Sequence, residues 1–350
     1  MVETAGARSR PSIDDVAALA GVSRATVSRV VNQQASVGEH LRVKVQAAVD
    51  ELGYVPNLAA RALMTRTLDV VALVASEPDT RVFSDPYFSA LIRGVSIEVN
   101  RARLQLVLLM AQGAEDLERV KRFLARSPLD AAMLISGHAD DGLADELSRH
   151  RIPYVIGGRP MDGVAAPYVD SDNVRGAELA TAHLLSTGRR RIGTVSGPLD
   201  MTAGRDRLQG YRSTMGKRYR PELVEVGDFT KEGGQRAATA LLERAPDLDA
   251  LFAASDLMAI GALTALRRAG RRVPEDVALV GFDDNEWAQA ADPALTTVHQ
   301  DPHLQGRAMV RLLLSRHRPE IAIEPEEGVP DLRDDDHAIL PVELVIRESA

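Results

Sequence analysis

The sequence predicts an α/β protein with a small all-helical domain at its N-terminus. From about Leu68 onward, short β-branched runs such as LDVVALV, LQLVLLM and DVALVGF alternate with helical stretches, which is the pattern of parallel sheets covered by helices. Before Leu68 the apolar residues recur only at helical spacing. Because 350 residues allow more than one domain, a boundary is expected near residues 57–67.

Composition argues against several classes of protein. Hydrophobic residues make up 45% of the chain and charged residues 26%, and no apolar run approaches the roughly 18 residues that span a bilayer. A disordered chain or a membrane protein is therefore not expected. The N-terminal segment lacks the apolar core of a secretory signal, and the absence of cysteine excludes disulfides and thiolate metal ligands. We expect a cytoplasmic protein.

Charge is distributed unevenly along the chain. The formal net charge is −8, yet residues 1–66 hold eight Lys and Arg against six Asp and Glu, a balance of +2 that leaves −10 on the remainder. A basic head on an acidic body is compatible with a DNA-binding module joined to a domain that stays off the DNA.

The segment SIDDVAALAGVSRATVSRVVN has the features of two short helices joined by a tight turn. Ser12 can cap the first helix, Gly21 tolerates the left-handed backbone of the turn, and Ser23 can cap the second helix. The apolar face of the first helix is expected to consist of Val16, Leu19 and Ala20.

The second helix has an apolar and a polar side. Its inward residues are expected to be Val27, Val30 and Val31, and its outer, small, polar and basic face Ala25, Ser28, Arg29 and Asn32. A third helix within GEHLRVKVQAAVDELG should complete the core with Leu41, Val45, Ala48, Val49 and Leu52. A capped helix crossing a second helix with such an outer face is typical of a helix-turn-helix, although an ordinary pair of antiparallel helices is the alternative.

DVAALAGVSRATVSRVVN, followed by YVPNLAARAL, closely resembles the head of the lactose/galactose repressor (LacI/GalR) family of bacterial transcription factors. The resemblance continues in order through DPYF, VDSDN, TGRRRIG, RLQGY, ASDLMAIGAL, VALVGFDDNE, PALTTVHQD and LPVELVIRES, over nearly the whole chain. It implies a three-helix helix-turn-helix head, a hinge helix, and a two-lobed core like a type I periplasmic binding protein, with parallel sheets.

The resemblance also implies domain limits. They are a flexible arm at 1–10, the helix-turn-helix domain at 11–56, the hinge helix at 57–66, and the effector-binding and dimerisation core at 67–350. Within the core, the N-lobe is expected at about 67–167 and 300–325, and the C-lobe at about 168–299 and 326–350.

Carried over from the family, Arg24, Ala25 and Arg29 resemble the residues that read base edges, because Arg can contact guanine and Ala a thymine methyl group. Phosphate contacts are implied for Ser12, Ser23, Thr26, Ser28 and Asn32. In the hinge segment NLAARALMT, Leu63 matches the apolar wedge that opens a base step in the minor groove, with Asn57 and Ala60 beside it. On residue types alone, a plain linker remains the alternative for this segment.

A ligand cleft is expected between the two lobes, outside the carboxyl ends of the strands. The residues that match its positions in the family are Tyr87, Phe88, Arg159, Asp170, Arg207, Phe229, Asp256 and Asp283. Carboxylates, guanidinium groups and aromatic rings together suit a polyhydroxyl ligand. Alternatives stay open: Asp172 matches the cleft but stands with Asn173 where a helix cap is expected, Tyr87 and Phe229 can be core residues, and Trp287 can cover the ligand or pack the lobe.

Enzyme motifs are missing from the sequence. There is no Gly-rich phosphate loop with Lys-Ser/Thr, no HExxH and no CxxC, and GTVSG at 193–197 has its Ser one place too late for a nucleophile elbow. His138 is interpreted as a loop residue and not as a metal ligand. No enzyme activity, cofactor or metal is expected.

The expected function is a sequence-specific DNA-binding regulator, with repression favoured, controlled by a small-molecule effector. A sugar or sugar derivative is favoured, although the family also accepts nucleobases and nucleosides. The partners are a pseudopalindromic double-stranded DNA operator and a second copy in a homodimer, and no leucine-heptad tail suggests a tetramer. A sugar- or nucleoside-binding protein without a regulatory role is the alternative. The acidic stretch at 323–337 is expected to be an exposed loop.

Overall fold

The computed structural model describes residues 11–31, 37–54, 69–127, 129–161, 164–321, 323–330, 332 and 336–350. The chain forms two compact units, Met1–Leu68 and Asp69–Ala350, each with its own core. No helix in the described part of either unit is long and apolar enough to cross a membrane.

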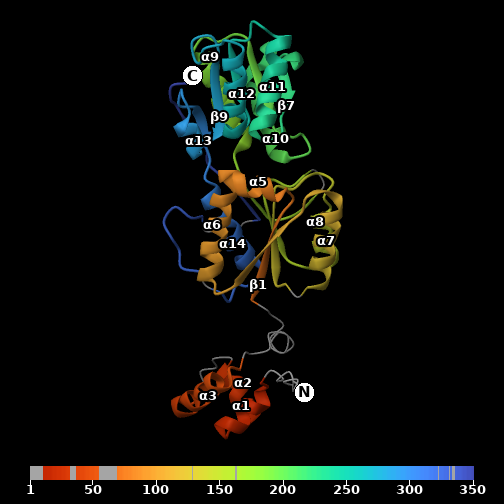
Figure 1. Cartoon of the computed structure of the whole chain (residues 1–350), viewed down its shortest axis with the longest axis vertical. Helices are drawn as coiled ribbons and strands as arrows, with labels where there is room; N and C mark the ends of the chain where they lie inside the picture. The colour runs from red at the N-terminus through yellow and green to blue at the C-terminus, as the bar shows by residue number, and fades with distance from the viewer. Residues whose placement is uncertain are drawn as a thin grey trace, which may run out of the picture. The chain divides into compact units, whose positions relative to one another are not determined.

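The first unit contains three helices, α1 (Ile13–Ala20), α2 (Arg24–Val31) and α3 (Glu39–Leu52) (Figure 1). Ser12 caps α1 as expected: its hydroxyl accepts from the Asp15 amide at 3.2 Å, and its own amide donates to the Asp15 carboxylate at 2.7 Å. Gly21 ends α1 at a φ of 59°, the left-handed conformation that the turn requires. The core consists of Val16, Ala17, Ala20, Val27, Val30, Val45 and Ala48.

One core expectation for α1 is wrong, because Leu19 is 45% exposed. At 100° per residue, Val16, Ala17 and Ala20 lie on one narrow side of the helix and Leu19 lies at its rim. Val31, Leu41, Val49 and Leu52 are only partly buried.

The second unit consists of two lobes, each built on a six-stranded sheet (Figure 1). The first sheet has the order β11-β5-β4-β3-β1-β2, and all its neighbouring strands are parallel. Its strands are β1 (Val70–Ala75), β2 (Gln105–Met110), β3 (Ala131–Ile135), β4 (Tyr154–Gly157), β5 (Tyr168–Ser171) and β11 (His337–Leu340).

Helices cover both faces of the first sheet. One face packs against α6 (Pro86–Arg101) and α14 (Pro302–His317), and the other against α7 (Gly113–Arg126) and α8 (Leu143–Arg149). The short helix α5 (Asp79–Ser84) follows β1. Gly94 and Gly306 let α6 and α14 approach closely, because a Cβ on Gly94 would lie 2.0 Å from the His303 carbonyl oxygen.

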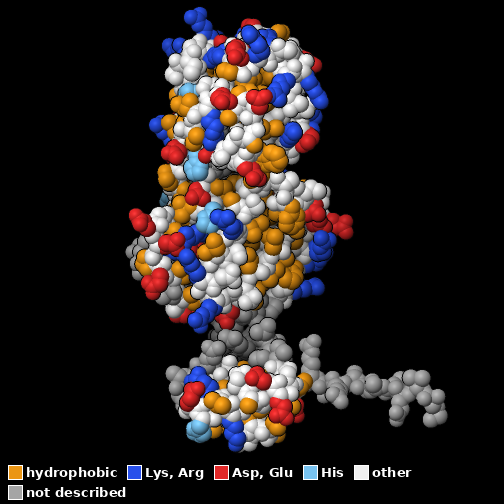
Figure 2. Space-filling model, turned by 60° about the vertical axis from the view of Figure 1, so that its left-hand side comes forward, with side chains coloured by type: hydrophobic (Ala, Val, Ile, Leu, Met, Phe, Trp, Pro, Cys, Tyr) orange, Lys and Arg blue, Asp and Glu red, His pale blue; other side chains and the backbone are white. Residues whose placement is uncertain are grey.

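The second sheet has the order β12-β10-β9-β8-β6-β7, in which β12 alone is antiparallel to its neighbour. Its strands are β6 (Ile192–Ser196), β7 (Val224–Val226), β8 (Ala250–Ala253), β9 (Ala278–Asp283), β10 (Thr296–His299) and β12 (Glu343–Val345). The covering helices are α9 (Asn173–Ser186), α10 (Thr202–Met215), α11 (Lys231–Arg244), α12 (Asp256–Arg268) and α13 (Glu286–Ala290), with short 3₁₀ turns at Gly216–Arg218 and Pro221–Leu223. Charged side chains of both signs are interspersed over the visible face of this lobe (Figure 2).

The chain crosses between the lobes three times, after β5, after β10 and after β11. The expected lobe limits at residues 168 and 326 are therefore wrong, because β5 and β11 complete the first sheet. A run of β-branched residues predicts a strand but does not identify the sheet that it joins. A hydrogen bond of 3.0 Å from the Asp172 amide to the Leu340 carbonyl ties two of these crossings together.

The acidic loop of residues 323–330 is largely exposed, as expected, and it is tied to the first lobe. The guanidinium of Arg307 donates to both carboxylate oxygens of Glu326, at 3.0 and 2.6 Å, and Arg101 also pairs with Glu326. These hydrogen bonds lower the pKa of Glu326 to about 2. Arg307 in turn donates to the fully buried Glu98 at 2.7 Å, so one chain of ion pairs links the loop to α6 and α14.

Candidate functional site

A cavity lies between the two lobes, where the carboxyl ends of both sets of parallel strands meet. Ser136 and Gly158 follow strands of the first sheet, and Phe229 and Ser255 follow strands of the second. Loops at this end of parallel strands are the usual place for a ligand in α/β folds. Of the predicted site residues, six line this cavity: Tyr87, Phe88, Asp170, Arg207, Phe229 and Asp283.

Arg207 on α10 is the central charge of the cavity wall, and it is only 5% exposed. Its Nε donates to the Asn173 side-chain oxygen at 2.8 Å, and its Nη1 donates to the Ala254 carbonyl at 2.5 Å. The carboxylate of Asp283 lies 3.5 Å from Nη1, and the guanidinium carbon lies 3.6 Å from the centre of the Phe282 ring. Arg207 therefore has a carboxylate, two neutral acceptors and a ring face around it.

Two buried carboxylates face the cavity with raised pKa values. Burial raises the pKa of Asp170 to about 6, although the amides of Arg159 and Ser171 donate to it, each at 2.9 Å. Burial likewise raises the pKa of Asp283 to about 7, against the charge of Arg207 and a 2.7 Å hydrogen bond from Gln300. Asp283 also has a φ of 121°, a conformation that L-residues rarely adopt. Strained, poorly solvated carboxylates of this kind are typical of binding sites.

The sequence left open whether Asp172 and Asn173 cap a helix or belong to the cleft, and the structure gives each residue one of these roles. Asp172 is the N-cap of α9, because its carboxylate accepts from the Arg175 amide at 3.0 Å. Asn173 lines the cavity and donates to Asp170 at 3.0 Å while it accepts from Arg207. It therefore connects a carboxylate of the first sheet to the guanidinium of α10.

Sequence reasoning missed several polar residues of the cavity wall, among them Arg81, Asp85 and Gln300. Arg81 on α5 pairs with Glu77 and lies against the rings of Phe88 and Phe229, at 5.7 and 5.2 Å from their centres. Asp85 caps α6 by accepting from the Tyr87 amide at 3.0 Å, and burial raises its pKa. For Gln300 the position directly after β10 was the available signal, whereas Arg81 lies on α5 and Asp85 follows that helix, so no strand end marked them.

Two predicted ligand residues, Arg159 and Asp256, are not part of the cavity wall. Arg159 makes a two-pronged ion pair with Asp206 of the other lobe, at 3.0 and 2.6 Å. Asp256 is fully buried and accepts from the Thr297 hydroxyl at 2.6 Å and the Asn285 amide at 3.0 Å, while burial raises its pKa. Trp287 is half exposed on α13 and also lies outside the wall.

Polar contacts beside the cavity hold the lobes together. Besides the Arg159–Asp206 pair, the Thr202 hydroxyl donates to the Arg159 carbonyl at 2.7 Å. His138 Nδ1 of the first lobe lies 2.7 Å from the Asp200 carboxylate of the second, and the Asp200 carbonyl accepts from the Ala139 amide at 2.9 Å. The structure therefore describes a closed arrangement of the lobes, with charged pairs on the closure surface.

His138 carries a proton on both ring nitrogens near neutral pH. Its Nε2 lies 3.5 Å from Glu77 and its Nδ1 contacts Asp200. Hydrogen bonding to Glu77 raises the pKa of His138 to about 9, against the effect of burial and with the help of Asp200. A doubly protonated imidazole can donate to both carboxylates, so His138 bridges the two lobes.

In the first unit, the outer face of α2 presents the side chains expected there. Arg24, Ala25 and Arg29 are exposed, and Thr26 and Ser28 are partly buried. The Arg24 guanidinium lies 3.5 Å from Asp14, but both side chains are mostly exposed, so this pair is weak. The Ser12 and Ser23 hydroxyls accept from backbone amides at the starts of α1 and α2, the latter from Thr26 at 3.1 Å. The predicted Asn32, Asn57, Ala60 and Leu63, and the arm and hinge segments, lie outside the described residues.

Comparison with known proteins identifies both parts of the chain. Residues 12–57 match the model of the lacI family of bacterial regulatory proteins, and residues 181–350 match that of a periplasmic binding protein-like domain. The HTH-type transcriptional regulator CelR of Thermobifida fusca is 46% identical over 98% of this chain and 99% of its own length. The ribose operon repressor of Escherichia coli K12 is 34% identical over 87% of this chain and 92% of its own length.

Solved structures agree with this assignment. A complex of the transcriptional regulator CelR with cellobiose matches at a TM-score of 0.75 and 44% identity, covering 97% of this chain and 100% of that one. The lac repressor dimer bound to operator and the anti-inducer ONPF matches at a TM-score of 0.81 and 27% identity, covering 97% and 99%.

A helix-turn-helix head joined to a two-lobed α/β body defines a DNA-binding transcriptional regulator with a ligand-binding domain. The chain belongs to the lacI family of bacterial regulatory proteins. The predicted fold class and the predicted regulatory function are thereby confirmed, and the alternative of a binding protein without a regulatory role is not favoured.

The charge on His138 predicts a pH-dependent stability of the closed body. Its pKa rises from about 6.5 in the unfolded chain to about 9 in the fold, so its stabilising effect is complete below pH 6.5 and is lost as pH rises through 9. We expect His138→Gln to lower the melting temperature by about 2 °C at pH 6.5, corresponding to about 1 kcal/mol for a partly screened group, with the difference vanishing near pH 9.5. Thermal unfolding monitored by circular dichroism across this range measures the effect.

Asp140→Asn, an exposed carboxylate of the same loop, is the matched control and should follow the parent protein at every pH. Asp200→Asn should give only part of the loss seen with His138→Gln at pH 6.5, because Glu77 has the larger effect on the pKa of His138. A difference between His138→Gln and the parent that does not change with pH would contradict the bridging role of the imidazolium.

Proposed function

We propose that the cavity between the lobes binds a sugar and that this binding controls the affinity of the helix-turn-helix head for its operator. The observation that carries the proposal is the arrangement of Arg207, Asp283 and Asp170 beside the ring of Phe229 in one buried wall. Carboxylates accept from sugar hydroxyls, a guanidinium spans two adjacent oxygens, and an aromatic ring covers an apolar C–H face.

The raised pKa values of Asp170 and Asp283 support a polyhydroxyl ligand further. A carboxylate with a raised pKa is one that its surroundings solvate poorly. Ligand hydroxyl groups would donate the hydrogen bonds that burial withholds, so bound sugar should favour the ionised form of both groups.

We infer that the effector is cellobiose or a closely related glucose disaccharide. The relative that shares 46% identity over nearly the full length is named CelR, and the solved structure of a CelR complex contains cellobiose. Polar residues beyond the predicted set, among them Arg81, Asp85 and Gln300, extend the polar surface of the wall toward α5 and β10.

The predicted roles in DNA recognition and the predicted limits of the arm, the helix-turn-helix domain and the hinge helix are part of the same proposal. Arg24, Ala25 and Arg29 on the outer face of α2 would read base edges in the major groove, and the serine and threonine residues around them would contact phosphates. Two copies would bind a pseudopalindrome as a homodimer, with Leu63 of each hinge segment inserted in the minor groove. We also propose that the protein represses transcription, that it is located in the cytoplasm and that it is not an enzyme.

Effector binding would act through the angle between the lobes. The polar pairs Arg159–Asp206 and His138–Asp200 stabilise the closed arrangement. A sugar that contacts both walls would add to this stabilisation and shift the population of closed chains. A coupling of about 1–3 kcal/mol between effector and operator is typical of such proteins.

Asp283→Asn should abolish the response to effector without harming the fold. The substitution keeps the size of the side chain and removes a charge that burial disfavours, so the melting temperature should stay within about 2 °C of the parent value or rise. We expect at least a tenfold loss of cellobiose affinity by isothermal titration, because the amide cannot replace a charged acceptor. Operator affinity without sugar should change less than threefold.

Asp276→Asn serves as the control, since this carboxylate pairs with Arg272 on the surface of the same lobe. It should bind cellobiose as the parent does. Unchanged sugar binding by Asp283→Asn would show that Asp283 is not part of the site. If the parent protein binds ribose or a nucleoside but not cellobiose, the effector is not cellobiose.

Arg24→Ala should relax the base preference at one symmetric pair of operator positions. The operator is first selected from a randomised duplex library, and base-by-base variants are then compared by fluorescence anisotropy. A lost bidentate contact costs about 1–3 kcal/mol per half-site at that position and little elsewhere. Equal weakening on every sequence would make Arg24 a phosphate contact instead.

A further inference from the structure

A carboxylate buried behind the cavity wall connects three segments of the second lobe. Asp256 begins α12, directly after the cap residue Ser255, and its side chain is fully buried. One of its oxygens accepts from the Thr297 hydroxyl of β10 at 2.6 Å, and the other accepts from the Asn285 amide at 3.0 Å. Because Asp256 is not part of the cavity wall, its effect on a bound ligand must pass through the segments that it holds.

A glycine in β9 makes room for this carboxylate. Gly281 is the neighbour of Thr297 across the β9–β10 pair, and a Cβ on Gly281 would lie 2.2 Å from Oδ1 of Asp256. Atoms in a packed interior do not approach that closely, so a larger residue at this position would displace the carboxylate. The Thr297 hydroxyl donates to the same oxygen from the next strand. Gly281 and Thr297 therefore fix the position of Asp256 on the sheet.

The segment held by Asp256 is a strained turn that carries Asp283. Asp283 ends β9 with a φ of 121°, and Asp284 follows it with a φ of 57°. Two consecutive L-residues at positive φ are costly and persist only where their surroundings hold them. The Asn285 amide, which comes next, is the donor to Asp256, while the Asn285 side-chain oxygen accepts from the Trp287 amide at 2.9 Å and caps α13. The turn is therefore tied to the starts of α12 and α13.

A second set of contacts holds the middle of the turn. The carboxylate of Asp284 pairs with Arg347 at 2.5 Å and lies 3.2 Å from Nδ1 of His299. These contacts restrain the side chain of Asp284, whereas the hydrogen bond to Asp256 restrains the backbone of the residue that follows it. Only the backbone contact acts directly on the chain direction that the strained φ angles create.

We propose that Asp256 is a positioning residue for the sugar site, because its carboxylate holds the turn in the conformation that presents Asp283 to the cavity. The Asp283 carboxylate accepts from Gln300 at 2.7 Å and lies 3.5 Å from Nη1 of Arg207. If the turn relaxed, a shift of about 1 Å would be enough to lose directional contacts of this kind. The inference rests on the proposed binding of a sugar in this cavity.

The test removes the Thr297 hydroxyl and leaves every residue of the cavity wall in place. Thr297→Val keeps the shape of the side chain but leaves a buried oxygen of Asp256 without its donor, so the carboxylate should move. Affinity for cellobiose, measured by isothermal titration, should fall at least about fivefold. Thr297→Ser restores the hydroxyl and should bind within about twofold of the parent protein. Gly281→Ala, which displaces the same carboxylate, should give a loss similar to that of Thr297→Val.

Thr194→Val is the matched control. Thr194 is another buried strand residue of the second sheet, and its hydroxyl donates to the Phe252 carbonyl at 2.9 Å. The substitution makes the same chemical change without touching the turn after β9. It should bind cellobiose as the parent does, even where its melting temperature falls as far as that of Thr297→Val.

Variants of Asp256 itself separate geometry from charge. In Asp256→Asn the side-chain oxygen can accept from the Asn285 amide while the side-chain NH₂ donates to the Thr297 hydroxyl, so cellobiose affinity should stay within about threefold of the parent value. Asp256→Ala removes both contacts and should lose at least about tenfold. Adding Asp283→Asn to Asp256→Ala should then cost little more, because Asp283 is already displaced, and a double-mutant cycle measures this coupling.

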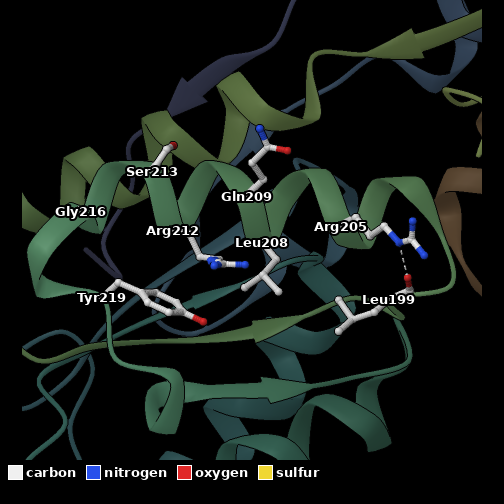
Figure 3. A pocket seen from close by; sticks show the side chains of 8 residues that line it. All are labelled: Leu199, Arg205, Leu208, Gln209, Arg212, Ser213, Gly216 and Tyr219. Atoms are coloured by element: carbon white, nitrogen blue, oxygen red, sulfur yellow. Dashed lines mark hydrogen bonds between the residues drawn. The ribbon is translucent and has the colours of Figure 1, made fainter. Parts of the chain in front are cut away.

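Hydrogen exchange followed by mass spectrometry monitors the turn without any sugar. Amides between Asp283 and Ala288 should exchange faster in Thr297→Val than in the parent or in Thr194→Val, because the turn opens more readily. Gln209→Ala is a further control, since Gln209 lines a separate hollow on the outer side of α10, and no residue of that hollow lines the cavity between the lobes (Figure 3). It should change neither exchange nor affinity.

Three results would overturn the proposal. Equal losses of affinity in Thr297→Val and Thr194→Val would reduce the effect to a general loss of stability. A loss in Asp256→Asn as large as in Asp256→Ala would show that charge matters and not the position of the turn. Unchanged affinity and exchange in Thr297→Val would show that the Asp284 contacts hold the turn alone. Faster exchange in Thr297→Val, with no cellobiose binding by the parent, would instead support the hold on the turn and refute the choice of sugar.

Discussion

The arrangement of the second unit around its cavity depends on one buried charge, the guanidinium of Arg207. A cation that is 5% exposed must find its solvation within the protein, and it does so in the Asn173 amide oxygen, the Ala254 carbonyl and the nearby Asp283. These partners come from α9, from the end of β8 and from the end of β9. Satisfying Arg207 therefore fixes three segments of the wall relative to one another.

The hydrogen bonds that solvate the Arg207 guanidinium also connect the two lobes. Asn173 donates to Asp170 of the first sheet while it accepts from Arg207, so the two walls share one hydrogen-bond network. The carboxylates in this network have raised pKa values because burial leaves them short of donors. A ligand rich in hydroxyl groups supplies those donors, which is why closure around a sugar would stabilise the site more than closure around water alone.

The features that could be predicted from the sequence are those that depend on residues close together along the chain. The caps at Ser12 and Ser23 and the turn at Gly21 involve residues a few positions apart, and Asp283 ends the strand β9. Arg159 and Asp256, which were expected in the cleft, lie outside the cavity wall, and their partners are distant in sequence: Arg159 pairs with Asp206 of the other lobe, and Asp256 with Thr297. The membership of β5 and β11 in the first sheet likewise depends on pairing between distant segments.

The central claim is that the cavity and the head share one conformational equilibrium. It is tested most directly by measuring the affinity for cellobiose with and without operator, and the affinity for operator with and without cellobiose. Cellobiose is titrated into the protein free and bound to its selected operator, and operator affinity is measured with and without saturating cellobiose. Linkage requires the two ratios to be equal, and the account predicts that they differ from one by about 5- to 150-fold. Tight binding of both ligands with both ratios equal to one would contradict it.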